Sequence, residues 1–187
     1  MAGPELGQQA QRILLRIARA AIRAGLDGVS YRPPVPEDPA LATAAGAFVT
    51  LHAAGSLRGC IGTLEGTRPL YQTVAEMARS AAFRDPRFPP LTDQEWGDIR
   101  VEISALTPLE DIDDPQLVQV GRHGVVISQG GRRGVLLPQV AAQYGWDRET
   151  FLARTCDKAG LPADAWRRGA SIQVFEARVF GEVDTPE

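Results

Sequence analysis

Residues 99–106 have the sequence IRVEISAL, and this stretch decides the fold class. Its apolar side chains occupy every second position, at Ile99, Val101, Ile103 and Ala105. A period of two places these side chains on one face of a β-strand, while the polar residues between them face the other way. We therefore predict a strand here with one buried face and one polar face.

Further strands are predicted on both sides of this stretch. Residues 46–64, GAFVTLHAAGSLRGCIGTL, favour two strands around an AAGS turn. Residues 123–138, HGVVISQGGRRGVLLP, favour a hairpin that turns at Gly130 and Gly131. Residues 171–180, SIQVFEARVF, form the final predicted strand.

Helical periodicity predicts the remaining regular elements. The first helix runs from about Pro4 to Ala24 and stops at Gly25, and the second covers residues 67–83. A short helix begins at Pro138, a longer one covers residues 148–160 after the N-cap Asp147, and residues 161–170 form one more turn. Because strands and helices are mixed without regular alternation, we predict an α+β fold with a mainly antiparallel sheet flanked by helices.

Two segments are predicted to lack regular structure. Residues 26–40 include SYRPPVPEDPA, whose prolines exclude a regular helix or a central strand. We expect this connection to run extended along the surface. The polar residues 182–187 are predicted to be a frayed tail.

Length and composition limit the classes of function. A chain of 187 residues suits one domain with at most two lobes. With 44% apolar and 23% charged residues it is not a disordered chain, and we expect neither a membrane span nor a signal peptide. The net charge of −3 disfavours a broad electrostatic hold on nucleic acid. The 19 arginines still leave a nucleic-acid-associated regulatory factor as one alternative.

Cysteine and histidine usage indicates the compartment. Cys60 and Cys156 are the only cysteines and lie far apart, so we expect two free thiols in a reducing cytoplasm rather than a disulfide scaffold. No motif with zinc-ligand spacing involves His52 or His123. We therefore predict neither a metal site nor a cofactor.

The segment LRGCIGTL, residues 57–64, is the strongest candidate for a chemical site. Gly59 and Gly62 flank the cysteine and allow the backbone to approach closely on both sides of it. In an extended strand Arg58 and Cys60 share a face about 6.6 Å apart along the chain, where a guanidinium favours the thiolate. Cys60 is therefore a candidate nucleophile, and the alternative is a small apolar residue of the core.

A base for Cys60 is not evident within this hairpin. A two-residue turn at Ala54 and Gly55 pairs Cys60 with Val49 and places His52 on the opposite face. A three-residue turn pairs Cys60 with Phe48 and leaves His52 about 13 Å away along the strand. Neither register gives a Cys–His hydrogen bond, so a base has to come from elsewhere in the fold. The candidates are Glu102, His123 and Asp85.

The segment AAFRDPRFPP, residues 81–90, is a second dense cluster. Arg84, Asp85 and Arg87 can form fixed ion pairs, with Asp85 ordering arginine, and Phe83 and Phe88 can anchor the loop. One interpretation is a structural corner. The other is an arginine fork for a carboxylate or a phosphate.

An ordered series of motifs resembles the AMMECR domain family: LRGCIGT, RPL, AAFRDPRFPPL, VEISAL, GVLLPQVA and KAGLP. The resemblance extends from about Leu14 to Phe175, and the core of the motif is intact at residues 57–62. Prokaryotic members of the family are called protein A of the AmmeMemoRadiSam gene set. The resemblance implies an α+β body of two subdomains, with the motif near the groove between them, so residues 1–187 would form one AMMECR-like domain with two lobes.

The resemblance also implies partners, namely a Memo-like protein and a radical SAM protein of the same gene set. The leading hypothesis is a cytoplasmic accessory component of a modification pathway, which binds a small anionic ligand or a partner protein around the motif. The enzyme hypothesis makes Cys60 a nucleophile. The candidate binding residues are Arg58, Gly59, Gly62, Thr63, Arg84, Asp85, Arg87 and Glu102.

Overall fold

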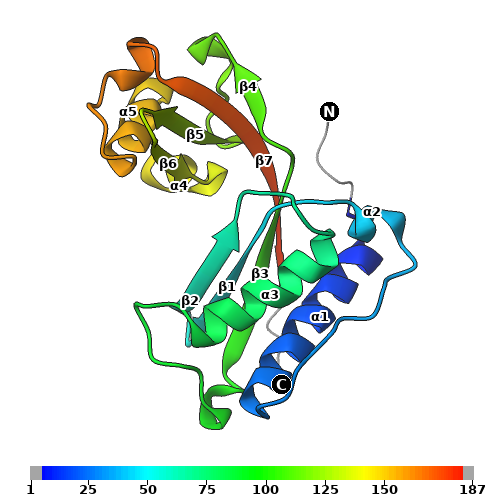
Figure 1. Ribbon diagram of the computed structural model, residues 1–187. Helices are drawn as coiled ribbons and strands as arrows, with labels where there is room; N and C mark the ends of the chain where they lie inside the picture. The colour runs from blue at the N-terminus through cyan, green and yellow to red at the C-terminus, as the bar shows by residue number, and fades with distance from the viewer. Residues whose placement is uncertain (1–5, 183–187) are drawn as a thin grey trace. The chain divides into compact units, whose positions relative to one another are not determined.

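A computed structural model describes residues 6–182, which contain α-helices and β-strands (Figure 1). The α-helices are α1 (Gln8–Leu26), α2 (Pro39–Ala42), α3 (Leu70–Phe83), α4 (Pro138–Tyr144) and α5 (Arg148–Lys158). The strands are β1 (Ala47–Ala53), β2 (Ser56–Thr63), β3 (Ile99–Leu106), β4 (Glu110–Ile112), β5 (His123–Gln129), β6 (Arg132–Leu136) and β7 (Ser171–Gly181). Short 3₁₀ turns lie at Asp93–Glu95, Pro115–Leu117 and Ala165–Arg167.

The sheet confirms the predicted fold class. Its strands follow the order β2-β1-β3-β7-β5-β6, and β4 pairs with β7 outside this path. The pairs β1–β2, β1–β3, β4–β7, β5–β6 and β5–β7 are all antiparallel. The protein is therefore α+β, with a mainly antiparallel sheet flanked by helices. No helix within residues 6–182 is long and apolar enough to cross a membrane.

The described chain forms two compact units. The larger comprises residues 6–106 and 178–182, and the smaller comprises residues 107–177. Strand β7 supplies residues 171–177 to the smaller unit and its remaining residues to the larger one. The groove expected between two subdomains stays a prediction.

In the larger unit, α1 and α3 cover one face of β2, β1 and β3 (Figure 1). The strands direct alternate apolar side chains such as Val49 and Ile103 toward these helices, where both are fully buried. The helices bury apolar side chains that include Leu14 of α1 and Val74 of α3. The opposite face of these three strands carries polar and half-buried residues, among them Cys60 of the motif.

The smaller unit has a core of its own. Strands β5, β6 and the first part of β7 bury Val125, Ile127 and Ile172 against α4 and α5. Helix α5 contributes Phe151, which is fully buried. The predicted N-cap is present, because the Asp147 carboxylate accepts the backbone N–H of Thr150 at 2.8 Å.

Several boundaries differ from the sequence prediction. Helix α1 continues past Gly25 to Leu26, and the chain leaves it through Gly28, which has a left-handed φ of +69°. Residues 27–38 form no regular element, but α2 then begins at Pro39 with Asp38 as its N-cap. Strand β4 was not predicted either, since its three residues are too few to show a period.

The two ends of the chain are described only in part. The predicted start of the first helix at Pro4 lies outside the described residues, as do residues 183–187 of the predicted frayed tail. Glu182 is fixed in place: its carboxylate accepts two hydrogen bonds from Arg19 and one from the backbone N–H of Val101.

Candidate functional site

The β1–β2 hairpin sets the position of the motif. Its turn is formed by Ala54 and Gly55 with φ angles of 49° and 74°, the two-residue type favoured by the twist of a hairpin. A bulge then leaves Arg58 unpaired, between the pairs His52–Leu57 and Leu51–Gly59. The bulge shifts the register by one residue, so that Cys60 lies opposite Thr50.

This register differs from both that were expected. Cys60 faces neither Val49 nor Phe48, and the extra residue turns its side chain to the same face as Thr50 and His52. His52 is two residues from Thr50 along β1 and lies on the same face. This register places His52 closer to Cys60 than the expected 13 Å. The structure nevertheless contains no hydrogen bond between His52 and Cys60.

The glycines of the motif are required by close packing. A Cβ atom on Gly59 would lie 2.3 Å from the carbonyl oxygen of Ala81 in α3, which is backbone and cannot move aside. A Cβ atom on Gly62 would lie 2.2 Å from the ring of Phe48, on the opposite face. Gly59 therefore lets the helix settle on the strand, and Gly62 gives space to an aromatic ring.

We call the side of the sheet that bears Cys60 the motif face. Its residues are Phe48, Thr50, His52, Cys60, Gly62 and Glu102, all half-buried. The Thr50 hydroxyl donates to the Cys60 sulfur at 3.2 Å, and Thr50 also pairs with Glu102 on β3. A thiol, a hydroxyl and a carboxylate thus lie in a row across three strands.

Asp85 and Arg87 fix the backbone of Cys60 from the exposed edge of β2. The Asp85 carboxylate, almost fully buried, accepts the backbone N–H of Cys60 at 2.8 Å. The Arg87 guanidinium donates two bonds to this carboxylate, at 2.9 and 2.7 Å, and a third to the carbonyl oxygen of Cys60 at 3.2 Å. The ion pair therefore occupies both peptide groups that an edge strand leaves open at this position.

Electrostatics supports the same arrangement. The Arg87 guanidinium holds the pKa of the Asp85 carboxyl well below its ordinary value, assisted by the backbone donors of Cys60 and Arg87 and opposed by burial. The hydrogen bond to Asp85 correspondingly raises the pKa of Arg87. Both groups are charged at neutral pH, as the predicted Asp–Arg pair requires.

Arg58 is bound in a second ion pair beside the first. Its Nε and Nη2 atoms donate to Glu95 at 2.5 and 3.1 Å, and Nη2 also donates to the Pro89 carbonyl at 3.0 Å. This contact with Arg58 lowers the pKa of Glu95 to about 2. The remaining Nη1 of Arg58 is buried without a partner among the described residues. The guanidinium groups of Arg58 and Arg87 both lie against the ring of Phe88.

The structure brings together most of the residues predicted for the site. Seven predicted residues lie on β2, on the motif face or in the loop at residues 84–90 that binds the backbone of Cys60. They are Arg58, Gly59, Cys60, Gly62, Asp85, Arg87 and Glu102. Thr63 accepts the backbone N–H of Glu65 and serves a local turn. Arg84 does not join the ion pair of Asp85 and lines a different pocket.

The candidate base His123 is not part of the site, and two residues of the site were not predicted. His123 lies in the smaller unit, where its Nδ1 accepts the backbone N–H of Gln119. The prediction missed Thr50 and Glu95. Alternation along β1 could have indicated Thr50, and the sequence TDQE at residues 92–95, a helix-capping pattern, could have indicated Glu95. Within residues 6–182 no cluster of His, Cys, Asp and Glu side chains could hold a metal ion.

Comparison with known proteins identifies relatives over nearly the whole chain. Residues 15–180 match the model of the AMMECR1 family. A protein of Methanothermobacter thermautotrophicus is 44% identical over 95% of this chain and 96% of its own length. One from Methanopyrus kandleri is 42% identical over 99% and 94%. The crystal structure of an uncharacterized protein from Pyrococcus horikoshii superposes with a TM-score of 0.83 at 41% identity, covering 90% of this chain and 89% of that one.

Proposed function

The chain belongs to the AMMECR1 family, and we propose that it is a cytoplasmic accessory component of a modification pathway. In this proposal it binds a partner protein at Cys60 on the motif face. One observation carries the proposal. Two charged residues, Asp85 and Arg87, fix the peptide groups of Cys60, while its side chain stays half-exposed. Such prior fixing lowers the entropy lost on association.

The charges at this site favour a partner segment over a small anion. Arg58 and Arg87 are already bound by Glu95 and Asp85, so little cationic character remains for a ligand. The motif face itself offers the thiol and the hydroxyl of Thr50, together with the carboxylate of Glu102. Hydrogen-bonding groups of this kind suit the backbone and polar side chains of a protein segment.

The proposed partners are the Memo-like protein and the radical SAM protein that the family resemblance implies. We propose to capture both from the same organism with the purified chain and to compare wild type with Thr50→Val and Cys60→Ser. Both variants should weaken capture, because Thr50→Val removes the hydroxyl that donates to the sulfur and Cys60→Ser replaces the large, polarisable sulfur with a smaller oxygen. Thr43→Val, which removes a hydroxyl from an exposed position, is the matched control. Unchanged capture by both motif variants would overturn the docking proposal.

A second candidate function is favoured by the row of Cys60, Thr50 and Glu102. A nucleophilic thiol needs a base, and a hydroxyl between a thiol and a carboxylate is one way to relay a proton. In that case Cys60→Ser would leave capture intact and abolish the output of the pathway. The same pair of measurements therefore separates a docking residue from a catalytic one.

A further inference from the structure

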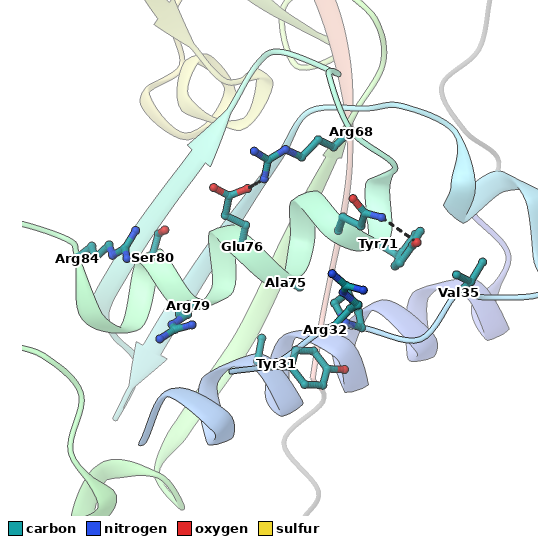
Figure 2. Close-up of a pocket in the computed structure, with 13 residues that line it drawn as sticks. Tyr31, Arg32, Val35, Arg68, Tyr71, Ala75, Glu76, Arg79, Ser80 and Arg84 are labelled. Atoms are coloured by element: carbon teal, nitrogen blue, oxygen red, sulfur yellow. Dashed lines mark hydrogen bonds and ion pairs between the residues drawn. The ribbon is translucent and has the colours of Figure 1, made fainter. Parts of the chain in front are cut away.

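A groove in the larger unit lies away from the motif face, on the outer side of α3 (Figure 2). It has a volume of about 610 Å³. One wall is α3 with its flanking residues, the other is the proline-rich connection at residues 31–35, and Ala21 of α1 contributes to the lining. We call it the arginine groove, because Arg32, Arg68, Arg79 and Arg84 line it.

The positive charges of this groove are largely unneutralised. Most arginines of the chain are bound to a carboxylate or a carbonyl oxygen, as Arg19, Arg58 and Arg148 are. In the groove only Arg68 is paired, with Glu76, which is the only acidic residue of the lining. Three guanidinium groups therefore remain: Arg32, Arg79 and Arg84 have no hydrogen-bond or ion-pair partner among residues 6–182.

The arrangement of these arginines fits an anion with more than one charge. Figure 2 shows Arg79 on α3, Arg84 directly after the end of α3 and Arg32 on the facing connection, so the cations come from both walls. Unpaired like charges repel one another, and a bound anion removes that cost. Guanidinium groups also match the planar, bidentate geometry of phosphate and carboxylate oxygens.

The groove offers apolar surface as well as charge. Tyr31 and Tyr71 contribute rings, Ala75 lies in α3 between the charged positions, and the side chain of Val35 is 76% exposed. A volume of this size is within the range of small-molecule sites, which combine apolar walls with a few polar anchors. The ligand should therefore carry an apolar or aromatic part beside its anionic groups.

The connection that forms one wall is stiff. Pro33, Pro34 and Pro36 restrict the backbone on either side of Val35 and favour an extended conformation. The backbone N–H of Val29 bonds to Ala24 at the end of α1, which sets the start of the connection. A wall that is ordered before binding loses little entropy when a ligand arrives.

We propose that the arginine groove binds a small phosphorylated organic molecule with at least two negative charges and a flat apolar part, as a nucleoside diphosphate has. The site is distinct from the motif face, which lies on the other side of the sheet. It provides the anion binding that the paired arginines near Cys60 do not. Arg84 is adjacent in sequence to Asp85, but it lines the groove and does not take part in the Asp85–Arg87 ion pair that binds the backbone of Cys60.

The test is direct binding to the full-length chain. Isothermal titration at low salt would compare ADP, AMP and pyrophosphate on wild type, Arg79→Ala and Arg32→Ala. We expect ADP to bind more tightly than AMP or pyrophosphate, and each variant to weaken ADP by about tenfold or more, as expected when a hydrogen bond to a charged group is lost. Added salt should weaken binding in wild type more than in the variants.

Arg133→Ala is the matched control, because Arg133 is exposed on β6 and, among the described residues, also has no partner. It should bind ADP as wild type does. A second readout is modification of arginines by a dicarbonyl reagent, in which ADP should protect Arg32, Arg79 and Arg84 but not Arg133. The proposal is overturned if none of the three phosphorylated probes binds, if the groove variants bind ADP like the control, or if a Glu-rich peptide binds and ADP does not.

Discussion

At the scale of single residues, the site is built around the peptide groups of Cys60 rather than around its sulfur. Each oxygen of Asp85 accepts two donors: Oδ1 binds the Nε and backbone N–H of Arg87, and Oδ2 binds Nη2 of Arg87 and the N–H of Cys60. A carboxylate can satisfy four donors in this way, whereas an amide offers one oxygen and would set its own N–H groups against the others. The geometry thus explains why an aspartate occupies position 85.

Replacing that carboxylate should change stability in a pH-dependent way. Because folding lowers the pKa of Asp85, its contribution is present above the ordinary value near 4 and is lost as the pH falls below it. Asp85→Asn should therefore cost about 2 kcal/mol at pH 7 and less at pH 3. Urea unfolding at both pH values measures this difference. Asp111→Asn, at an exposed position, is the control and should show neither effect. If Asp85→Asn costs as much stability at pH 3 as at pH 7, the lowered pKa of Asp85 is contradicted.

Gly59 tests the packing of the motif strand on α3. Gly59→Ala brings a Cβ atom to 2.3 Å from the Ala81 carbonyl, so the helix or the strand has to shift. We expect a loss of about 2 kcal/mol in the free energy of unfolding, typical of an overpacked core. Gly97→Ala is the control, since no atom lies within 4 Å of its added Cβ. Equal stabilities of the two variants in a urea titration would show that the contact yields easily.

The two cysteines should differ in reactivity. Cys60 is half-exposed, whereas Cys156 is fully buried in α5, where burial raises the pKa of its thiol. A small alkylating reagent should therefore modify Cys60 in the native protein and reach Cys156 only after unfolding. Peptide mapping by mass spectrometry identifies the modified residue. Preferential labelling of Cys156 would contradict this prediction.

At the scale of elements, the sequence predicted which segments are strands and helices but not how the motif hairpin is paired. The alternation at residues 99–106 and the helical stripe at 67–83 are local signals, and both elements are present. The bulged part of β2 contacts α3 at Ala81 and the loop at residues 84–90 at Asp85 and Pro89. Those contacts join residues more than 20 positions apart, as Cys60 and Asp85 are. No local period reports them, which is why the pairing of Cys60 with Thr50 was not predicted and His52 was placed too far from Cys60.

The turn of this hairpin carries strain that a substitution can relieve. Ala54 has a φ of 49°, a left-handed conformation that costs an L-residue about 1–2 kcal/mol and glycine almost nothing. Ala54→Gly should raise stability by about 0.5–1 kcal/mol after the greater flexibility of unfolded glycine is taken into account. Ala53→Gly, one residue earlier and inside β1, should instead lower it by a similar amount. Thermal unfolding of both variants decides, and a lower melting temperature for Ala54→Gly would count against a strained turn.

At the scale of the whole molecule, the net charge is negative although the arginine groove has a local excess of positive charge. The chain carries −3 overall, yet the arginine groove holds four guanidinium groups and one carboxylate. Composition alone disfavours a broad basic surface, which stays a prediction, and it could not reveal the groove. Its walls come from residues 31–35 and 68–84, which meet only through the packing of α3 and the connection.

The two compact units also have separate cores, which predicts separate local unfolding. Phe151 is fully buried in the core of the smaller unit, and Leu14 in that of the larger one. Phe151→Ala should cost about 3–5 kcal/mol, which is enough to expose one core without unfolding a typical domain completely. Hydrogen exchange followed by mass spectrometry should then show lost protection in β5, β6 and α5, with α1 and α3 still protected.

Leu14→Ala provides the reciprocal measurement, with protection lost in α1 and α3 and retained in β5 and β6. Strand β7 is the informative segment, because residues 171–177 belong to the smaller unit and the rest of the strand to the larger one. Its two parts should lose protection in different variants. If either substitution lowers protection uniformly along the chain, the two cores unfold as one cooperative unit, and β7 transmits the loss of one core to the other.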